Sequence, residues 1–496
     1  MTAASPPSAA GSPAGDPLAA ATAPKPLLGA VLIAIMALEL VQLYLGWAPA
    51  GLAGRALLLS LPLLALRALR AREAYLLAVA GGVFLLVWAG PPENLGPEDL
   101  EVVSRGLDRA LYLASFILLM GLLREGAVTS PAVLDCGSYV TLQPSRRRFL
   151  AVFTGSHLFS VLINLGALSL LAPIIQRGVR RGRDPEAPLD EIARVRERRQ
   201  LSASLRGFAW FLVWAPTAVT QAVLPTLIPG IDAGHLIGIG LAVAATMLLV
   251  SWAEDSLRWW PLRRRLRASG SLPRPVRQAF PGAAFGRLGA VCGLLFGLTL
   301  GFSWSAGVSV VSGVMLAAPV TLAVWVVAQQ GRRRLEAAAA RLREIATVSL
   351  PGAVREAVSL ACAGFIGTLA AHLVPADQVA AALELGSLPG WLFLLGLSVL
   401  VLLGGQVALS PITMAVFLGS LVAELGALPV DPTLAALAIA AGTAICTTGA
   451  PFASGTLMLA RASGYSGVTL TWRWNLAYTL ACVAVLLAVY AVLTAV

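Results

Sequence analysis

The residues from Arg146 to Arg183 read RRRFLAVFTGSHLFSVLINLGALSLLAPIIQRGVRRGR, an apolar stretch with arginines at both ends. Its apolar part, 149–175, is long enough to cross a bilayer, which takes roughly 20 residues of helix. Arginine marks the cytoplasmic side of a membrane span. Because both ends carry arginines, a single crossing would place one of the two clusters outside. We therefore predict a re-entrant hairpin that enters and leaves on the cytoplasmic side.

The apolar stretch 391–425 is the opposite case. It is too long for one ordinary span. The charged residues that flank it are all acidic, namely Asp377, Glu384, Glu424 and Asp431. We predict a second hairpin, which enters from the outer side.

The composition of the whole chain is that of a membrane protein. Hydrophobic residues make up 58% of the 496 residues and the mean hydropathy is +0.81, which is more apolar surface than a soluble protein of this size can bury. We predict an all-α polytopic protein of a bacterial-type inner membrane, with the N-terminus inside and the C-terminus outside. Besides the two hairpins it has about eleven spans, at 26–48, 52–67, 74–90, 107–123, 206–228, 234–252, 288–306, 309–328, 356–374, 433–460 and 475–495.

The net charge of +11 could indicate a nucleic-acid partner. With the two hairpins, however, all Lys and Arg residues fall on the cytoplasmic side except Arg55, Arg105 and Arg109. The charge is therefore a topology signal, and the expected partner is the lipid bilayer, not nucleic acid. Residues 1–25, rich in Ala, Ser and Pro, are predicted to be a disordered cytoplasmic tail. Residues 253–287 are predicted to be a basic cytoplasmic linker.

The predicted elements follow the same order in two halves. Residues 52–252 and 288–495 each give about three helices, a hairpin, a helix with a break and a final helix, while 26–48 is an additional first helix. The two hairpins open to opposite sides, so the halves form an inverted repeat. Many secondary transporters have this design, with the binding site at the midplane between the repeats.

Prolines interrupt the two helices that follow the hairpins. Pro216 lies in 206–228 and Pro451 in 433–460, and a proline in a helix removes a backbone donor and clashes with the preceding turn. Backbone groups freed inside a membrane must face protein or water. Freed helix N-termini suit an anion, and freed carbonyls and hydroxyls suit Na⁺. The alternative is that each proline only kinks a packed helix.

Polar side chains near these features are the candidate substrate- or ion-binding residues. Such residues can also serve as helix–helix contacts. The candidates are Ser160, Asn164, Thr217, Thr220, Gln221, Gln406, Ser410, Thr413, Thr447, Thr448 and Ser454.

Apart from Glu424, at the end of the second hairpin, the hairpins and broken helices contain no Asp or Glu. Intramembrane carboxylates often carry protons in pumps and transporters, so their absence favours Na⁺ coupling or uncoupled anion movement, with proton coupling still open. His157 is interpreted as structural. Glu39, in the additional first helix, lies outside the repeat and is not counted as a coupling residue. The five cysteines are scattered without metal-ligand spacing, so no resident cofactor or metal site is expected.

The spans, the oppositely facing hairpins and the breaks resemble the ion transporter superfamily. That group includes divalent anion:sodium symporters and, more distantly, arsenite pump membrane subunits and sodium/proton antiporters. Symporters of this group carry Ser-Asn-Thr at the hairpin tips. The corresponding residues here are Ile163-Asn164-Leu165 and Leu409-Ser410-Pro411, a partial match. The resemblance implies a homodimer and an elevator-like movement of the hairpins and broken helices.

These features predict a secondary active transporter for a small anionic solute, with Na⁺ as a candidate coupling ion. One alternative is a cation/proton antiporter or the membrane subunit of an ion-export complex. Because the chain has no P-loop, a pump would need a partner ATPase. The other alternative is an integral-membrane enzyme, but neither HExxH nor GxSxG occurs.

Overall fold

A computed structural model describes residues 25–88, 97–145, 147–184, 187–270, 279–330, 334–382, 384–426 and 428–495. Within these ranges every regular element is a helix. The predicted tail, except for its last residue, and part of the predicted basic linker, 271–278, lie outside the described residues. The remaining linker is helical at both ends, because α10 (Ala233–Arg258) runs into it, α11 (Trp260–Ala268) follows, and α12 begins at Gly282.

Nine helices in the described part of the chain are long and apolar enough to cross a membrane. They are α1 (Pro26–Leu45), α3 (Ala71–Trp88), α4 (Pro97–Val128), α10, α12 (Gly282–Ala306), α13 (Val310–Gln329), α16 (Val354–His372), the pair α20 (Pro432–Gly449) and α21 (Ser454–Ser463), and α22 (Leu476–Ala495). The prediction of an all-helical polytopic membrane protein is therefore confirmed. The count of eleven spans stays a prediction. Its two further members are α2 (Ala48–Leu64), which is only 17 residues long, and the broken pair α8 and α9.

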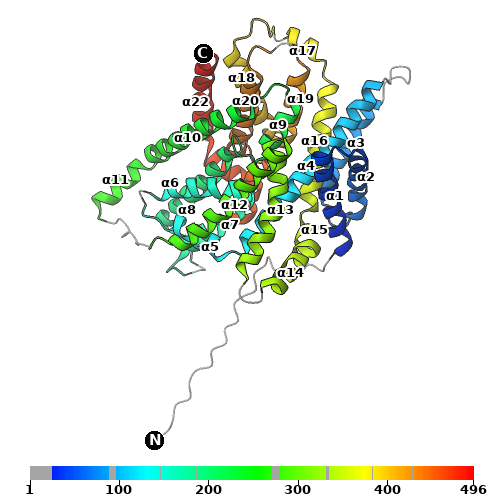
Figure 1. Ribbon diagram of the computed structural model, residues 1–496. Helices are drawn as coiled ribbons and strands as arrows, with labels where there is room; N and C mark the ends of the chain where they lie inside the picture. Colours follow the sequence, from blue (N-terminus) through cyan, green and yellow to red (C-terminus); the bar gives the residue numbers. More distant parts are fainter. Residues whose placement is uncertain are drawn as a thin grey trace.

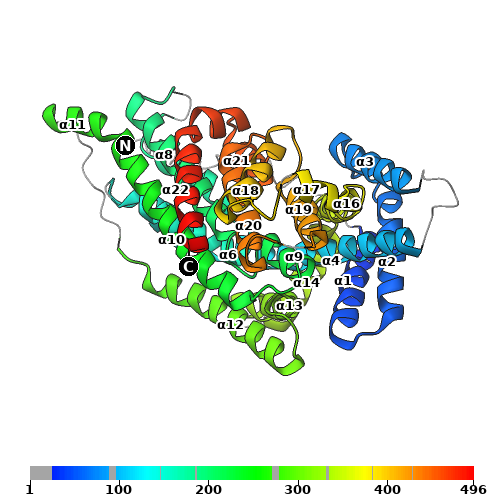
Figure 2. The same ribbon diagram turned by 90° about the horizontal axis from the view of Figure 1, so that it is seen from above.

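The helices form two lateral groups around a central bundle. In both views α1, α2 and α3 lie at one side of the molecule, and α10, α11 and α22 lie at the other (Figures 1 and 2). In Figure 1, α17 (Ala376–Ala382) and the end of α22 lie at one end of the bundle, and α14 (Arg334–Glu344) lies at the opposite end. Between α14 and α16 run a π-helical turn, Ile345–Ser349, and the short α15 (Leu350–Gly352).

The stretch with arginines at both ends folds into two helices that turn back on each other. They are α6 (Arg148–Ile163) and α7 (Gly166–Arg180), and Asn164 makes the turn with a φ of +48°. α7 returns to the end of α5 (Pro131–Thr141), because a Cβ atom placed on Gly178 would lie 3.4 Å from Leu142, just past α5. Both ends of the stretch therefore meet near the end of α5. Its re-entry on the cytoplasmic side of a membrane stays a prediction.

The second predicted hairpin has the same form. It consists of α18 (Gly390–Gln406) and α19 (Pro411–Glu424), and Ala408 in the turn has a φ of +66°. Its two ends also meet, since a Cβ atom on Gly390 would lie 2.7 Å from Val430.

The helices after both hairpins are broken at the predicted prolines. α8 (Glu191–Phe211) and α9 (Val219–Leu227) flank Pro216, and α20 and α21 flank Pro451. α8 begins well before the predicted residue 206, because the Asp190 side chain accepts a hydrogen bond from the backbone N–H of Ala193 and caps the helix. A π-helical turn, Thr469–Arg473, connects α21 to α22.

Helices that occupy equivalent positions in the two halves pack against each other. α4 precedes the first hairpin, α16 precedes the second, and the two cross at glycines. A Cβ atom on Gly364 would lie 3.0 Å from Leu113, and one on Gly106 would lie 2.5 Å from Leu369. Each half contains a helical hairpin followed by a broken helix. The inverted repeat of the two halves stays a prediction.

Candidate functional site

The first break leaves two carbonyls without their helical donors. Pro216 has no N–H to give to the carbonyl of Leu212, and the carbonyl of Val213 loses its donor where the helix unwinds. Side chains of the next half-helix replace both donors. Thr220 Oγ1 donates to the Leu212 carbonyl at 2.5 Å, and Gln221 Nε2 donates to the Val213 carbonyl at 2.6 Å. Two of the predicted site residues therefore satisfy the break itself.

At the second break a threonine side chain also replaces a backbone donor that a proline lacks. Pro451 has no N–H for the carbonyl of Thr447, four residues earlier. Thr456 Oγ1, in α21, donates to that carbonyl at 2.6 Å. Thr456 is fully buried. Its distance past Pro451 resembles that of Thr220 past Pro216.

Each hairpin tip is tied to the broken helix of its own half by a side-chain amide. Asn164 Nδ2 donates to the backbone carbonyl of Thr217 at 3.1 Å, and Thr217 Oγ1 donates back to the carbonyl of Val161 at 2.7 Å. In the second half, Gln406 Nε2 donates to the carbonyl of Gly449 at 3.2 Å. Three of the predicted residues, Asn164, Thr217 and Gln406, thus take part in contacts between a hairpin tip and a break.

Trp472 was missed by sequence reasoning. Its indole Nε1 donates to Gln406 Oε1 at 3.0 Å and so orients the amide that reaches Gly449. The π-helical turn that carries Trp472 follows Gly467, whose backbone touches that of Pro451. Trp472 is about half exposed, and Gln406 is half-buried, so this part of the second tip is open.

The other predicted residues have local roles or no hydrogen-bond partner. Hydroxyls that donate to carbonyls of their own helices belong to Ser160, Thr447 and Thr448. The Thr448 hydroxyl also lies 3.2 Å from the Thr479 hydroxyl of α22. Ser410 caps α19 by accepting from the N–H of Ile412 at 3.3 Å. Within the described residues the side chains of Thr413 and Ser454 make no hydrogen bond. Helical position alone cannot distinguish such roles from ligand binding.

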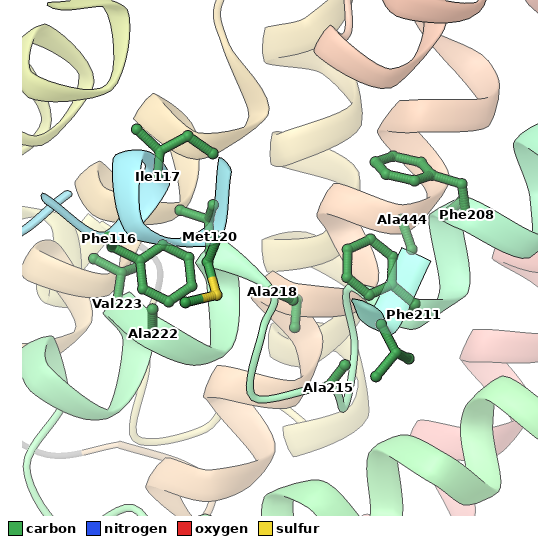
Figure 3. Close-up of a cluster of buried hydrophobic side chains, with 14 of the residues drawn as sticks. Phe116, Ile117, Met120, Phe208, Phe211, Ala215, Ala218, Ala222, Val223 and Ala444 are labelled. Atoms are coloured by element: carbon green, nitrogen blue, oxygen red, sulfur yellow. The ribbon is translucent and has the colours of Figure 1, made fainter. Parts of the chain in front are cut away.

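The space between the two breaks is apolar. Figure 3 shows Phe208 and Phe211 of α8 beside Ala444 of α20, with Ala215 and Ala218 in the unwound segment. A Cβ atom on Gly455, at the start of α21, would lie 2.6 Å from the Phe208 ring. Aromatic and small apolar side chains therefore pack between the two breaks, while a shared polar site of the predicted residues stays a prediction.

His157 fastens the first hairpin to the first break. Its Nδ1 lies 3.0 Å from the carbonyl of Gly207, and the indole Nε1 of Trp214 donates to its Nε2 at 2.9 Å. A carbonyl only accepts and an indole N–H only donates, so the imidazole is neutral with its proton on Nδ1. Both ring nitrogens are occupied, which fits the structural role predicted for this residue.

Arg124 lies at the first hairpin tip. A Cβ atom on Gly166, the first residue of α7, would lie 3.1 Å from Arg124 Cγ. The guanidinium makes no hydrogen bond or ion pair with any described residue. A cation beside a helix N-terminus favours an anion. The sequence presents Arg124 only as a topology marker, because its approach to the tip depends on tertiary packing.

Two cavities lie away from these clusters. One of about 390 Å³ lies between α2, α3, α4 and α16 and is lined by apolar side chains such as Leu58, Phe84 and Phe365. Another of about 440 Å³ lies between α5, α12 and α13. Neither is lined by a predicted site residue. No three His, Cys, Asp or Glu side chains in the described ranges come together as a metal site.

Comparison with known proteins reveals the fold. No protein-family model matches the chain, and no curated protein matches its sequence. The crystal structure of the YdaH transporter from Alcanivorax borkumensis, which has an unusual topology, aligns with a TM-score of 0.55 and 15% identity. The alignment covers 85% of this chain and 98% of the YdaH chain. The chain is therefore a multi-pass helical membrane protein with the fold of a transporter.

Proposed function

We propose that the chain is a secondary active transporter that moves a small anionic solute across a bacterial inner membrane by an elevator-like mechanism. The observation that carries the proposal is the pair of amide contacts from Asn164 to Thr217 and from Gln406 to Gly449. In each half a hairpin tip holds an unwound helix, so the two can move together as one unit. Such discontinuous helices form the binding sites of many inverted-repeat transporters.

The anionic character of the solute rests on Arg124 and on helix ends. Arg124 has no partner among the described residues and lies at the start of α7. The hairpin tips and the residues around the two breaks, 206–228 and 433–460, carry no carboxylate that could repel an anion. We expect Arg124→Gln to weaken solute binding and Arg124→Lys, which keeps the charge, to retain part of it.

The coupling ion is a separate question. Hydroxyl, amide and carbonyl oxygens at the breaks suit Na⁺, and each freed carbonyl that accepts one hydrogen bond keeps a second lone pair. A Na⁺-coupled cycle predicts that transport stops when Na⁺ is replaced by choline. The alternative, cation/proton exchange or a subunit of an ion-export complex, needs a titratable group outside the hairpins and breaks.

A homodimer is part of the proposal, and α12 offers a surface for it. Most of α12 is uncovered, and Cβ atoms placed on Gly293, Gly297 and Gly301 would meet nothing within 4 Å. Glycines four residues apart let membrane helices approach closely. We expect Gly297→Leu to convert dimers to monomers in light scattering of the purified protein, whereas Gly81→Leu on α3, also at an open position, should not.

The function is tested with the purified full chain. A panel of small carboxylates, phosphates and sulfonates is screened for compounds that raise the unfolding temperature, and the hits are measured as counterflow in proteoliposomes. We expect Ser410→Ala and Thr448→Ala to reduce counterflow and Ser305→Ala, on the exposed face of α12, to leave it unchanged. Counterflow that is unchanged in both site variants would overturn the site, and no transport of any hit would overturn the function.

A further inference from the structure

A second group of polar side chains lies among α1, α2 and α4, apart from the hairpins, and Glu39 is its buried member. It contains Glu39, Arg55, Asp108 and Arg109. Arg55 pairs with Asp108 and donates to Ser104 Oγ at 2.8 Å. Two of its members, Arg55 and Arg109, are among the three basic residues that the predicted topology leaves on the outer side. The group places these two arginines beside two acidic residues, Glu39 and Asp108.

Glu39 is the member without a partner. Its side chain is only 4% exposed, and it makes no hydrogen bond or ion pair with any described residue. Arg55 is already paired with Asp108, and Arg109 donates to Thr226. An ionised carboxylate that is buried without a partner costs several kcal/mol, whereas a neutral carboxylic acid does not carry that cost. The geometry therefore favours a proton on Glu39 in this conformation.

The surroundings of Glu39 contain few other charges. Arg55 of α2, together with Asp108, Arg109 and Tyr112 of α4, are the charged or titratable groups that act on it. The other elements that contact α1, namely α13, the π-helical turn and α15, contain no charged residue. A change in the charge of Glu39 therefore acts mainly on Asp108, Arg55 and Arg109.

Arg109 connects this group to the first broken helix. Its guanidinium donates to the backbone carbonyl of Thr226 at 3.0 Å and also contacts the Thr226 hydroxyl. Tyr112, one turn further along α4, donates to the carbonyl of Ala222 at 3.0 Å. Both acceptors lie in α9, the half-helix after Pro216. α4 thus holds the element that the proposed mechanism moves.

We propose that Glu39 is the proton-binding group of the transport cycle and that Arg109 relays its charge state to α9. Loss of the proton leaves a carboxylate near Arg109, which then competes with Thr226 for the guanidinium and loosens the contact between α4 and α9. Because coupling is reciprocal, movement of α9 changes the proton affinity of Glu39 to the same extent. This inference rests on the proposed function and names H⁺, in place of Na⁺, as the coupling ion.

Infrared difference spectra of the full chain in nanodiscs, recorded between pH 5 and pH 9, test the proton site. We expect a carbonyl stretching band of a protonated carboxyl group that is lost in Glu39→Gln and shifted in Glu39→Asp. The control is Glu73→Gln, because Glu73 is also buried but accepts a hydrogen bond from the N–H of Arg70 at 2.9 Å. Its spectrum should match that of the wild type. A band that persists in Glu39→Gln overturns the site.

Hydrogen exchange of Val219–Leu227 tests the relay on the same samples. We expect its protection to fall as the pH rises in the wild type and to be independent of pH in Glu39→Gln. Equal pH dependence in both proteins overturns the coupling to α9. Neither readout needs a solute, and Ser410→Ala should keep the Glu39 band, so failure of this inference is distinguishable from failure of the proposed transport site.

Discussion

Thr220 and Thr456 replace two hydrogen-bond donors that prolines cannot supply. Substitution by valine keeps the shape of each side chain but leaves the carbonyl of Leu212 or Thr447 buried without its donor. An unsatisfied buried acceptor costs about 1–3 kcal/mol. We therefore expect Thr220→Val and Thr456→Val to lower the unfolding temperature of the purified protein clearly.

Thr246→Val is the matched control for these two variants. Thr246 donates to the carbonyl of Ala242 at 2.9 Å inside the unbroken helix α10, where the backbone N–H of residue 246 also serves that carbonyl. Its loss should have little effect. Equal unfolding temperatures for all three variants would contradict the proposed role of the hydroxyls.

Arg206 is a buried arginine whose role cannot be read from its place in a basic cluster. Its side chain is 2% exposed, pairs with Glu254 at 2.9 Å, donates to Asn475 Oδ1 at 2.8 Å and lies over the Tyr478 ring. Breaking a buried ion pair from one side costs about 3–5 kcal/mol. We expect Arg206→Gln to cause a large loss of thermal stability and Arg206→Lys to restore little of it, because lysine cannot reproduce the planar contacts.

The comparison for Arg206 is Arg258→Gln. Arg258 pairs with the same carboxylate, that of Glu254, at 3.0 Å, but its side chain is 31% exposed. An exposed pair contributes about 0–1 kcal/mol. A loss in Arg258→Gln as large as that in Arg206→Gln would show that the stability lies in Glu254 and not in the burial of Arg206.

At the scale of elements, the start of α8 depends on one carboxylate. Hydrogen bonds from Arg183 and from the backbone N–H of Ala193 hold the pKa of Asp190 below its usual value. A lowered pKa means that this stability is present above the unfolded-state pKa and is lost as the pH falls through the folded-state value. The first turn of α8 should therefore fray in acid.

Hydrogen exchange of Glu191–Arg194 measures this fraying. Asp190→Asn keeps a good cap without a titrating group, so its protection should not change between neutral and acidic pH, whereas that of the wild type should fall. Asp190→Ala removes the cap and costs about 0.5–2 kcal/mol at neutral pH. Identical pH profiles for wild type and Asp190→Asn would rule out this origin of the acid sensitivity.

The element order could be predicted from hydropathy, charge and proline alone. Arginines at both ends of 149–175 predicted a hairpin, and Pro216 and Pro451 lie at both observed breaks. The start of α8 could not be predicted from apolar residues, because its first turns are polar and a cap defines them. The surroundings of Glu39 and Arg124 could not be predicted either, because they come from helices distant in sequence.

At the scale of the whole molecule, Phe208 and Phe211 pack beside Ala444 and the unwound segment with Ala215 and Ala218 (Figure 3). Sequence reasoning assigns each residue a depth from its position along an ideal straight helix, so it could not show how side chains pack between the breaks. Aromatic packing between the breaks depends on how α8 crosses α20 and α21. Glu39 was not counted as a coupling residue because it lies outside the predicted repeat. Its position beside α4 depends on the contact between α1 and α4 in the folded chain.

The central claim is that the arginine-flanked hairpin enters and leaves on one side of the membrane, and cysteine labelling in intact cells tests it most directly. In a chain with its native cysteines replaced, single cysteines are introduced at the exposed positions Ser145 and Arg181, with Ala382 as the outer control. We predict that a membrane-impermeant maleimide labels the Ala382 variant in intact cells and labels the other two only after permeabilisation. Labelling of Ser145 and Arg181 variants from opposite sides would make the hairpin a true span and contradict the inverted repeat.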